Sequence, residues 1–164
     1  MASMFWQVAL DALEAWLRAD TAFAATVTHS RGDATVVDIA QGVTPGMEPP
    51  CARLMRGPQG EIEGTTFRND LVDLPGQIVL HIDLHAPDAA ERDDDLSAKA
   101  AWGVLAAIEA EAIRSIRAFF APDRNLSAVL GAPFWCRLSG PTPVDEAYHP
   151  AVASRLTLTL NRQG

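Results

Sequence analysis

The chain has 164 residues, of which 48% are hydrophobic and 21% are charged. This composition excludes a disordered polypeptide, and the length is that of one domain, which we expect to cover residues 1–164. The formal charge is −8 and Lys99 is the single lysine, so the clustered basic residues that DNA or RNA recognition requires are missing. No apolar run approaches the roughly 20 residues of a membrane span.

The N-terminal stretch predicts an amphipathic helix that ends near residues 18–21. Its apolar residues recur at spacings of three and four positions, and they are Phe5, Ala9, Ala12, Leu13, Trp16 and Leu17. Asp11 and Glu14 fall on the opposite face. Because these two acids interrupt the apolar stretch and no basic start precedes it, we read no secretion signal and expect a protein kept in a cytoplasm.

The region from residue 34 to residue 75 predicts short strands separated by turns. Residues 34–39 and 51–55 are expected strands, because they are apolar or β-branched and a loop rich in glycine and proline lies between them. Arg56 to Pro75 has glycines at 57, 60 and 64, which weaken a regular strand. We expect this segment to form an arm or loop.

The clearest strand runs from Gln77 to His85. Its aliphatic residues, Ile78, Leu80, Ile82 and Leu84, alternate with residues that are mainly polar. One aliphatic face and one mainly polar face are typical of an antiparallel sheet that is covered on one side.

A long helix is expected from Leu96 to about Phe120. The acidic residues 93–95 suit its N-terminus, and Pro122 stops it. Apolar residues spaced at three and four positions predict its core stripe, which contains Ala101, Val104, Leu105, Ile108, Ala112 and Ile116.

Two strands are expected after this helix. The first covers Phe134 to Leu138 and is ended by glycine and proline at 140, 141 and 143. The second covers Ala153 to Asn161, where leucines alternate with polar residues. The elements together predict an α+β fold, with two helices packed on one face of a mixed, mostly antiparallel β-sheet.

His81, Asp83 and His85 have the residue types of a metal site, and alternate residues of a strand share a face. Alternate residues are also about 6.5–7 Å apart, which is wide for ligands of one ion. No further ligand is identifiable, so we favour polar side chains on an exposed strand face. A small metal-binding enzyme or ligand-binding domain built on these three residues is the alternative of a different class.

No enzyme signature is found elsewhere. Ser, His and Asp are present, but no GxSxG elbow accompanies them, and the glycines from 57 to 64 lack the Gly-Lys-Ser/Thr ending of a phosphate-binding loop. We therefore expect no catalytic residues, no cofactor and no resident metal. Trp6 and Trp102 lie off the apolar stripes of their helices, and exposed tryptophans are favoured at protein interfaces. Interface contact and partial burial are both open for these two residues.

Three segments carry a resemblance to a known family: VALDALEAWL at 8–17, QIVLHIDLHAPDAAERDDDLSAKAAWGVLAAI at 77–108, and SRLTLTL at 154–160. With the order helix, strands, long helix and terminal strand, they resemble the tail terminator, or tail completion, proteins of long-tailed bacteriophages and tail-like particles. The resemblance implies a non-enzymatic virion protein at the tail end next to the neck, assembled in the host cytoplasm.

The resemblance also implies partners. Such proteins form hexameric rings that bind the tail tube protein, end tube growth, and join the tail to the neck or head-tail connector proteins; some cap the sheath protein. We expect the interface to include Arg56, Gln59, Glu61, Phe67 and Arg68 of the arm, together with Trp6 and Trp102. Another neck or minor tail completion protein is the alternative within virion assembly.

Deleting Gly57 to Gly64 is expected to weaken ring or tube binding while the monomer stays folded, because the segment is expected to dock on a neighbour. Circular dichroism would check the fold and sedimentation would check assembly. Unchanged assembly would remove the arm from the interface.

Overall fold

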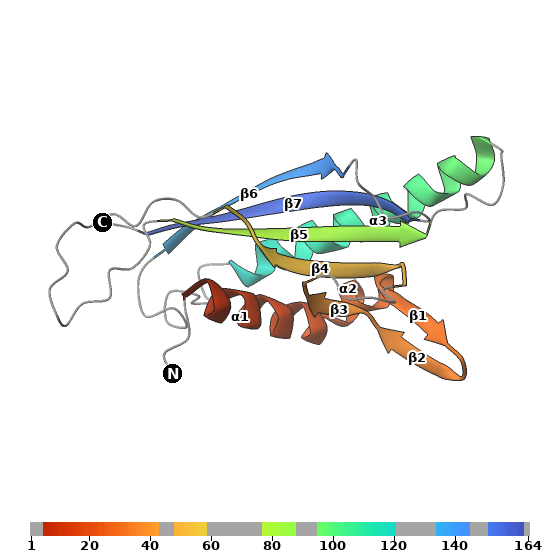
Figure 1. Cartoon of the computed structure of the whole chain (residues 1–164), viewed down its shortest axis with the longest axis horizontal. Helices are drawn as coiled ribbons and strands as arrows, with labels where there is room; N and C mark the ends of the chain where they lie inside the picture. Colours follow the sequence, from red (N-terminus) through yellow and green to blue (C-terminus); the bar gives the residue numbers. More distant parts are fainter. Residues whose placement is uncertain are drawn as a thin grey trace, which may run out of the picture.

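The computed structural model describes residues 5–42, 48–58, 77–87, 95–120, 134–144 and 151–162, and it has the predicted α+β architecture (Figure 1). The helices are α1 (Phe5–Ala19), α2 (Thr21–Thr26) and α3 (Asp95–Phe119). The strands are β1 (Thr28–Arg31), β2 (Ala34–Val37), β3 (Ile39–Gln41), β4 (Cys51–Arg56), β5 (Gln77–Pro87), β6 (Phe134–Pro143) and β7 (Ala151–Arg162).

Five strands form the main sheet in the order β3-β4-β5-β7-β6. Strands β3 and β4 are parallel, and the other three neighbouring pairs are antiparallel, so the predicted mixed, mostly antiparallel sheet is confirmed. Strand β5 is central and pairs along its whole length with β7, from Gln77 opposite Asn161 to Pro87 opposite Ala151. Strands β1 and β2 form a separate hairpin.

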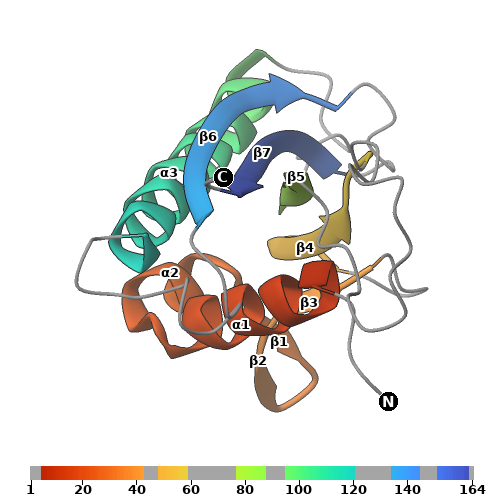
Figure 2. The same cartoon turned by 90° about the vertical axis from the view of Figure 1, so that its left-hand side faces the viewer.

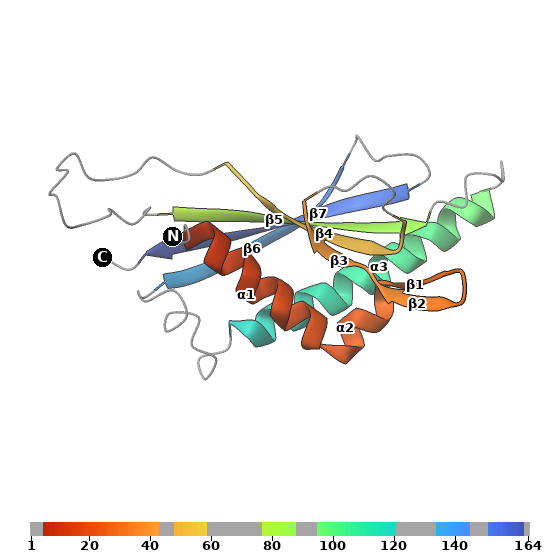
Figure 3. The ribbon, with the colours of Figure 1, turned by 60° about the horizontal axis from the view of Figure 1, so that its bottom comes forward.

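The helices cover one face of the main sheet, as Figure 3 shows from the helix side and Figure 2 shows end-on. Helix α1 contacts β3, β4 and β5, and α3 contacts β5 and β7. The core lies between these layers. Its fully buried aliphatic side chains include Leu13 and Leu17 of α1, Ile108 and Ile116 of α3, and Leu80, Ile82, Leu156 and Leu158 of the sheet. Each contributes about 1.5–3 kcal/mol of transfer free energy.

Polar contacts fix the helices to one another. The Trp16 indole donates to the carbonyl oxygen of Ser115 at 3.0 Å, and its ring lies 5.4 Å from that of Phe119. The Asp20 side chain caps α2 by accepting from the backbone N–H of Phe23 at 3.2 Å, and it also accepts from Arg114 of α3 at 2.8 Å. These bonds hold α1, α2 and α3 as one layer.

The predicted strand at residues 34–39 is wrong as a single element. The chain forms β2 and β3, which belong to different sheets, and β1 was not expected at all. Gly32, with a φ of 62°, lies in the turn that joins β1 to β2. The backbone N–H of Asp38 donates to the carbonyl of Val27, so the chain leaves the hairpin there before β3 starts.

Val104 is 44% exposed, so its place in the predicted core stripe of α3 is wrong. The other five residues of that stripe are buried: Ala101, Leu105, Ile108, Ala112 and Ile116. These positions already fill the helical face that meets the sheet, and Val104 lies beside it.

Strand β6 runs through the glycine and prolines that were expected to end it. It reaches Pro143, with an irregularity of register between Ser139 and Thr142. Because β6 is an edge strand, a proline there costs no hydrogen bond to a second neighbour. Gly140, with a φ of 98°, occupies the irregularity, and a Cβ on it would lie 2.6 Å from the carbonyl oxygen of Arg155.

Replacing Gly140 with alanine is therefore expected to destabilise the fold by about 1–3 kcal/mol, through backbone strain and the collision with β7. Gly103 is the matched control, because it lies exposed in α3 with no atom within 4 Å of a built Cβ. Gly103→Ala should stabilise by about 0.5–1 kcal/mol, since alanine favours the helix. Urea unfolding of both variants measures the contrast, and equal effects would contradict it.

Candidate functional site

The face of the sheet away from the helices carries the three residues considered as metal ligands. Asp83 and His85 are each 5% exposed, and His81 is half-buried. The expectation that they form an exposed polar strand face is therefore wrong. Strand β5 is buried on both faces, and its second face needs partners for its polar groups.

Arg155 of β7 supplies the partner of Asp83. The two residues are opposite each other in the register, and the guanidinium donates from Nε to Oδ1 at 2.6 Å and from Nη2 to Oδ2 at 2.8 Å. This bidentate geometry is the strongest form of an arginine–carboxylate pair. Both carboxylate oxygens of Asp83 are therefore occupied by a cation from the protein itself.

Arg53 of β4 is the register partner of Asp83 on the other side and is only 2% exposed. Its Nη1 donates to Oδ1 of Asp38 at 2.6 Å, and Oδ2 of Asp38 lies 3.1 Å from Nε2 of His29. Asp38, Arg53, Asp83 and Arg155 thus form a row of alternating charge across the sheet, which we call the charged row. Alternation lets each buried charge lie beside an opposite one.

This geometry does not favour a metal site. Within the described residues, no group of three or more His, Cys, Asp or Glu side chains is placed to hold a metal ion. Burial lowers the pKa of His81 and of His85, so both histidines are neutral near pH 7. Nδ1 of His85 is buried and has no hydrogen-bond partner among the described residues. The arrangement is that of an internally paired polar layer.

The two thiols are poor nucleophiles. Burial raises the pKa of Cys51 to about 12, and burial also raises the pKa of Cys136 to about 12. Cys51 lies on β4 opposite His85, but its thiol stays protonated at neutral pH. Neither cysteine has the thiolate character that covalent catalysis requires.

Two of the residues expected at an interface lie together. The guanidinium carbon of Arg56, at the end of β4, is 5.0 Å from the centre of the Trp6 ring, which is a cation–π contact. Trp6 also packs against the core. Gln59, Glu61, Phe67 and Arg68 lie outside the described residues. The pair therefore sits where the chain enters the expected arm.

Gly57 directly follows β4 and is still hydrogen-bonded to β5. Its backbone N–H donates to the carbonyl of Val79 at 2.8 Å, and a Cβ on it would lie 2.7 Å from Cγ1 of Val79. A deletion that starts at Gly57 would remove part of the β4–β5 pairing. The deletion that tests the arm alone starts at Gln59.

Trp102 is not close to this pair. It lies on α3, is 68% exposed, and borders a hollow of about 360 Å³ with Pro143 of β6 and Val152 of β7. Ser154 also lines this hollow, and its buried Oγ has no hydrogen-bond partner in the part of the chain that the structure describes. Trp6 and Trp102 therefore lie at opposite ends of the sheet, and they belong to separate surfaces.

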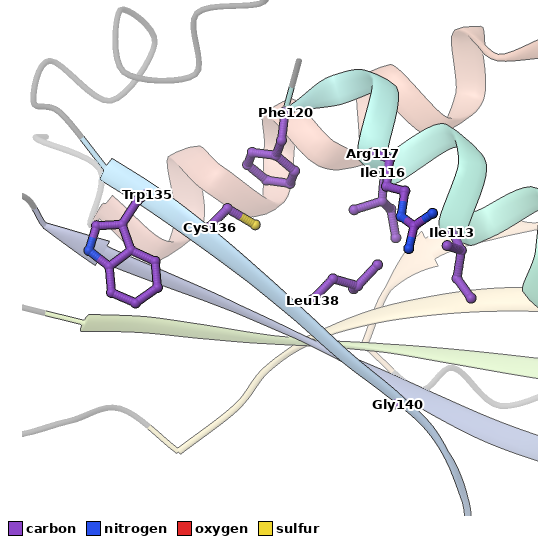
Figure 4. A pocket seen from close by; sticks show the side chains of 8 residues that line it. All are labelled: Ile113, Ile116, Arg117, Phe120, Trp135, Cys136, Leu138 and Gly140. Atoms are coloured by element: carbon purple, nitrogen blue, oxygen red, sulfur yellow. The ribbon is translucent and has the colours of Figure 1, made fainter. Parts of the chain in front are cut away.

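A groove of about 550 Å³ lies between the C-terminal half of α3 and β6 (Figure 4). We call it the β6 groove, and its apolar lining is Ile113, Ile116 and Phe120 from the α3 side with Trp135, Cys136 and Leu138 from β6. Arg117 is the charged residue among the described residues that line the groove. Helix α3 makes its main sheet contacts with β5 and β7, and the groove lies between this helix and β6.

The sequence analysis did not identify this groove. Trp135 is 49% exposed, but its position in a strand gave no sign that the strand lies at the sheet edge. Trp135, Arg137 and Ser139 share one face of β6 and are exposed, whereas Cys136 and Leu138 share the other face and are half-buried. This alternation was the available signal. The strand order, which depends on pairing between distant segments, was needed to interpret it.

Comparison with protein-family models gave no match for this chain, and comparison with curated proteins gave no significant relative. No helix in the described part of the chain combines the length and hydropathy that a bilayer span requires.

Arg155→Met is expected to destabilise the protein by about 2–3 kcal/mol, because it leaves the buried carboxylate of Asp83 unpaired while Arg155 itself is partly exposed. Adding Asp83→Leu should restore part of this loss. Glu111→Gln, which breaks the exposed Glu111–Arg114 pair, is the control and should cost within about 0.5 kcal/mol. Denaturant unfolding of Arg155→Met, Asp83→Leu, the double variant and the control gives four values. Additive losses at 83 and 155 would contradict a coupled pair.

Proposed function

We propose that this chain is a structural virion protein that caps the end of a bacteriophage tail tube as a hexameric ring. In that role it ends tube polymerisation and presents a docking surface to the head or neck. The sequence resemblance supports the proposal through the segments at 8–17, 77–108 and 154–160. In the fold these segments contribute α1, β5 with most of α3, and β7, in the order that the resemblance requires.

The observation that carries the proposal is the edge of the sheet at β6, with whose outer side no described segment pairs. The edge strand is ten residues long, the β6 groove lies behind it, and the exposed Trp135 lies on it. An uncovered edge strand beside an apolar groove is a surface suited to another protein chain. On the sheet face away from the helices, by contrast, Arg53 is paired with Asp38 and Arg155 is paired with Asp83 in the charged row.

A ring suits such a surface. A ring requires two different patches on each subunit that fit each other, so that the contact repeats around an axis. Six modest contacts to the tube then act together, and their combined strength exceeds that of each one. The formal charge of −8 is compatible with a ring through which DNA passes, because an acidic lining does not hold the phosphate backbone.

Particles assembled without this protein are expected to carry tails that exceed the normal length, because tube polymerisation is not stopped. Electron microscopy of negatively stained particles measures the tail length. Normal tails that remain unattached to filled heads would contradict the proposal and assign the chain to the neck instead. Adding the purified protein to growing tubes should stop growth and place a ring of density at one tube end.

A further inference from the structure

The two edges of the main sheet differ in their openness. Strand β6 forms one edge, and no described segment pairs with its outer side. Strand β3 forms the other edge but has only three residues, and the carbonyl of Ile39 accepts a hydrogen bond from Arg18 of α1. A side chain of α1 thus occupies a backbone carbonyl at the β3 edge. A neighbouring protein that approached this edge would therefore contact the outer surface of α1.

The β6 edge is basic. Arg117 lies at the groove. Arg137 lies on β6 itself, on the strand face opposite the groove-lining Cys136 and Leu138, so the two arginines flank the edge from its two sides, and both are exposed. Neither arginine has an ion pair with any described residue. In a chain with a formal charge of −8, two exposed arginines at one edge favour a partner that brings carboxylates.

The β3 edge carries carboxylates on α1. Asp11 is exposed and accepts from the Gln41 amide at 2.7 Å and from the Gln7 amide at 2.9 Å. Glu14 accepts from the same Gln41 amide at 2.9 Å and pairs with Arg18 at 3.0 Å. Hydrogen bonding, first from Gln41, lowers the pKa of Asp11, so this carboxylate stays ionised. Asp11 has no cationic partner among the described residues.

The exposed residues beside these acids on α1 have small side chains. Ala15 and Ala19 of α1 are exposed, and they lie one and two turns beyond Asp11. Short side chains let a helix approach an apolar groove closely, with Asp11 free to reach a neighbouring arginine. Glu109 of α3 lines the separate hollow beside Trp102.

We infer that neighbouring copies of this chain associate edge to edge, with the β6 groove of one copy receiving the α1–β3 edge of the next. In this contact Arg117 and Arg137 face Asp11 and Glu14 of the second copy. The strand order places the two edges four strand spacings apart, which is roughly 19 Å. When two copies join through different edges, the pair still has one free edge of each kind. Further copies can therefore be added until a ring closes. The ring rests on the proposed function; the contact itself does not.

Charge reversal on each edge tests the contact. Arg117→Glu with Arg137→Glu, here called the acidic variant, makes both edges acidic. Asp11→Lys with Glu14→Lys, the basic variant, makes both edges basic. Each variant alone should need at least about tenfold more protein to assemble than the wild type, because like charges then face each other. An equal mixture should assemble as the wild type does, because each altered edge again meets its opposite.

Assembly is measured by sedimentation velocity over a concentration series and by native mass spectrometry. Both measurements use the protein alone and the protein mixed with purified tail tubes, whose ends would template the ring under the proposed function. Arg31→Glu and Asp33→Lys are the control variants, because each makes the same kind of charge reversal, at one residue, at the tip of the β1–β2 hairpin. Thermal unfolding checks that every variant folds. A mixture as defective as its two components, or charge reversals without effect, would overturn the contact.

The outcomes separate this inference from the proposed function. Overlong tails in particles without the protein, together with unaffected charge reversals, would retain the tail role and reject the edge contact. Restored assembly in the mixture, together with tails of normal length, would retain the contact and reject the tail role.

Discussion

The bidentate pair between Asp83 and Arg155 allows β5 to lie at the centre of the sheet with both faces buried. Its first face supplies Leu80 and Ile82 to the core under α1 and α3. Its second face contains an ionisable side chain that is 5% exposed, which is tolerable only because a guanidinium saturates both oxygens. The pair also fixes the β5–β7 register, since a slip of one residue would move Asp83 into the aliphatic layer.

The same constraint extends to β4. Arg53 lies between Asp38 and Asp83 in the charged row, and no described residue bonds to its buried Nε. A buried arginine in that position requires negative charge on both sides. Asp38 therefore has to stand at the start of β3, where the chain leaves the β1–β2 hairpin. The parallel pairing of β3 with β4 is thus tied to electrostatics as well as to backbone hydrogen bonds.

The sequence predicted the parts of the fold whose cause is local. Alternating leucines and isoleucines identified β5 and β7, and apolar spacing identified α1 and α3, because those periods follow from backbone geometry. The buried second face of β5 was missed, since Arg155 is 72 residues from Asp83 and a polar alternation resembles a solvated strand face. Trp6 and Arg56 were expected at an interface and lie in contact, but Arg117 and Arg137 were not expected there. Their importance follows from the position of β6 at the sheet edge, and long-range pairing decides that position.

An edge strand has to be protected from pairing with the strands of other protein chains. The two halves of β6 are protected in different ways. Its second half contains Gly140, Pro141 and Pro143, whose irregular register and missing N–H groups prevent the addition of another strand. Its first half has regular register and carries Arg137, a charge that repels a second copy of the same edge. Two β6 edges therefore disfavour each other, whereas an edge that bears Asp11 and Glu14 is attracted. The residue that blocks a symmetric dimer is thus the same residue that selects a head-to-tail neighbour, and this selection is the property that a closed ring of identical subunits requires.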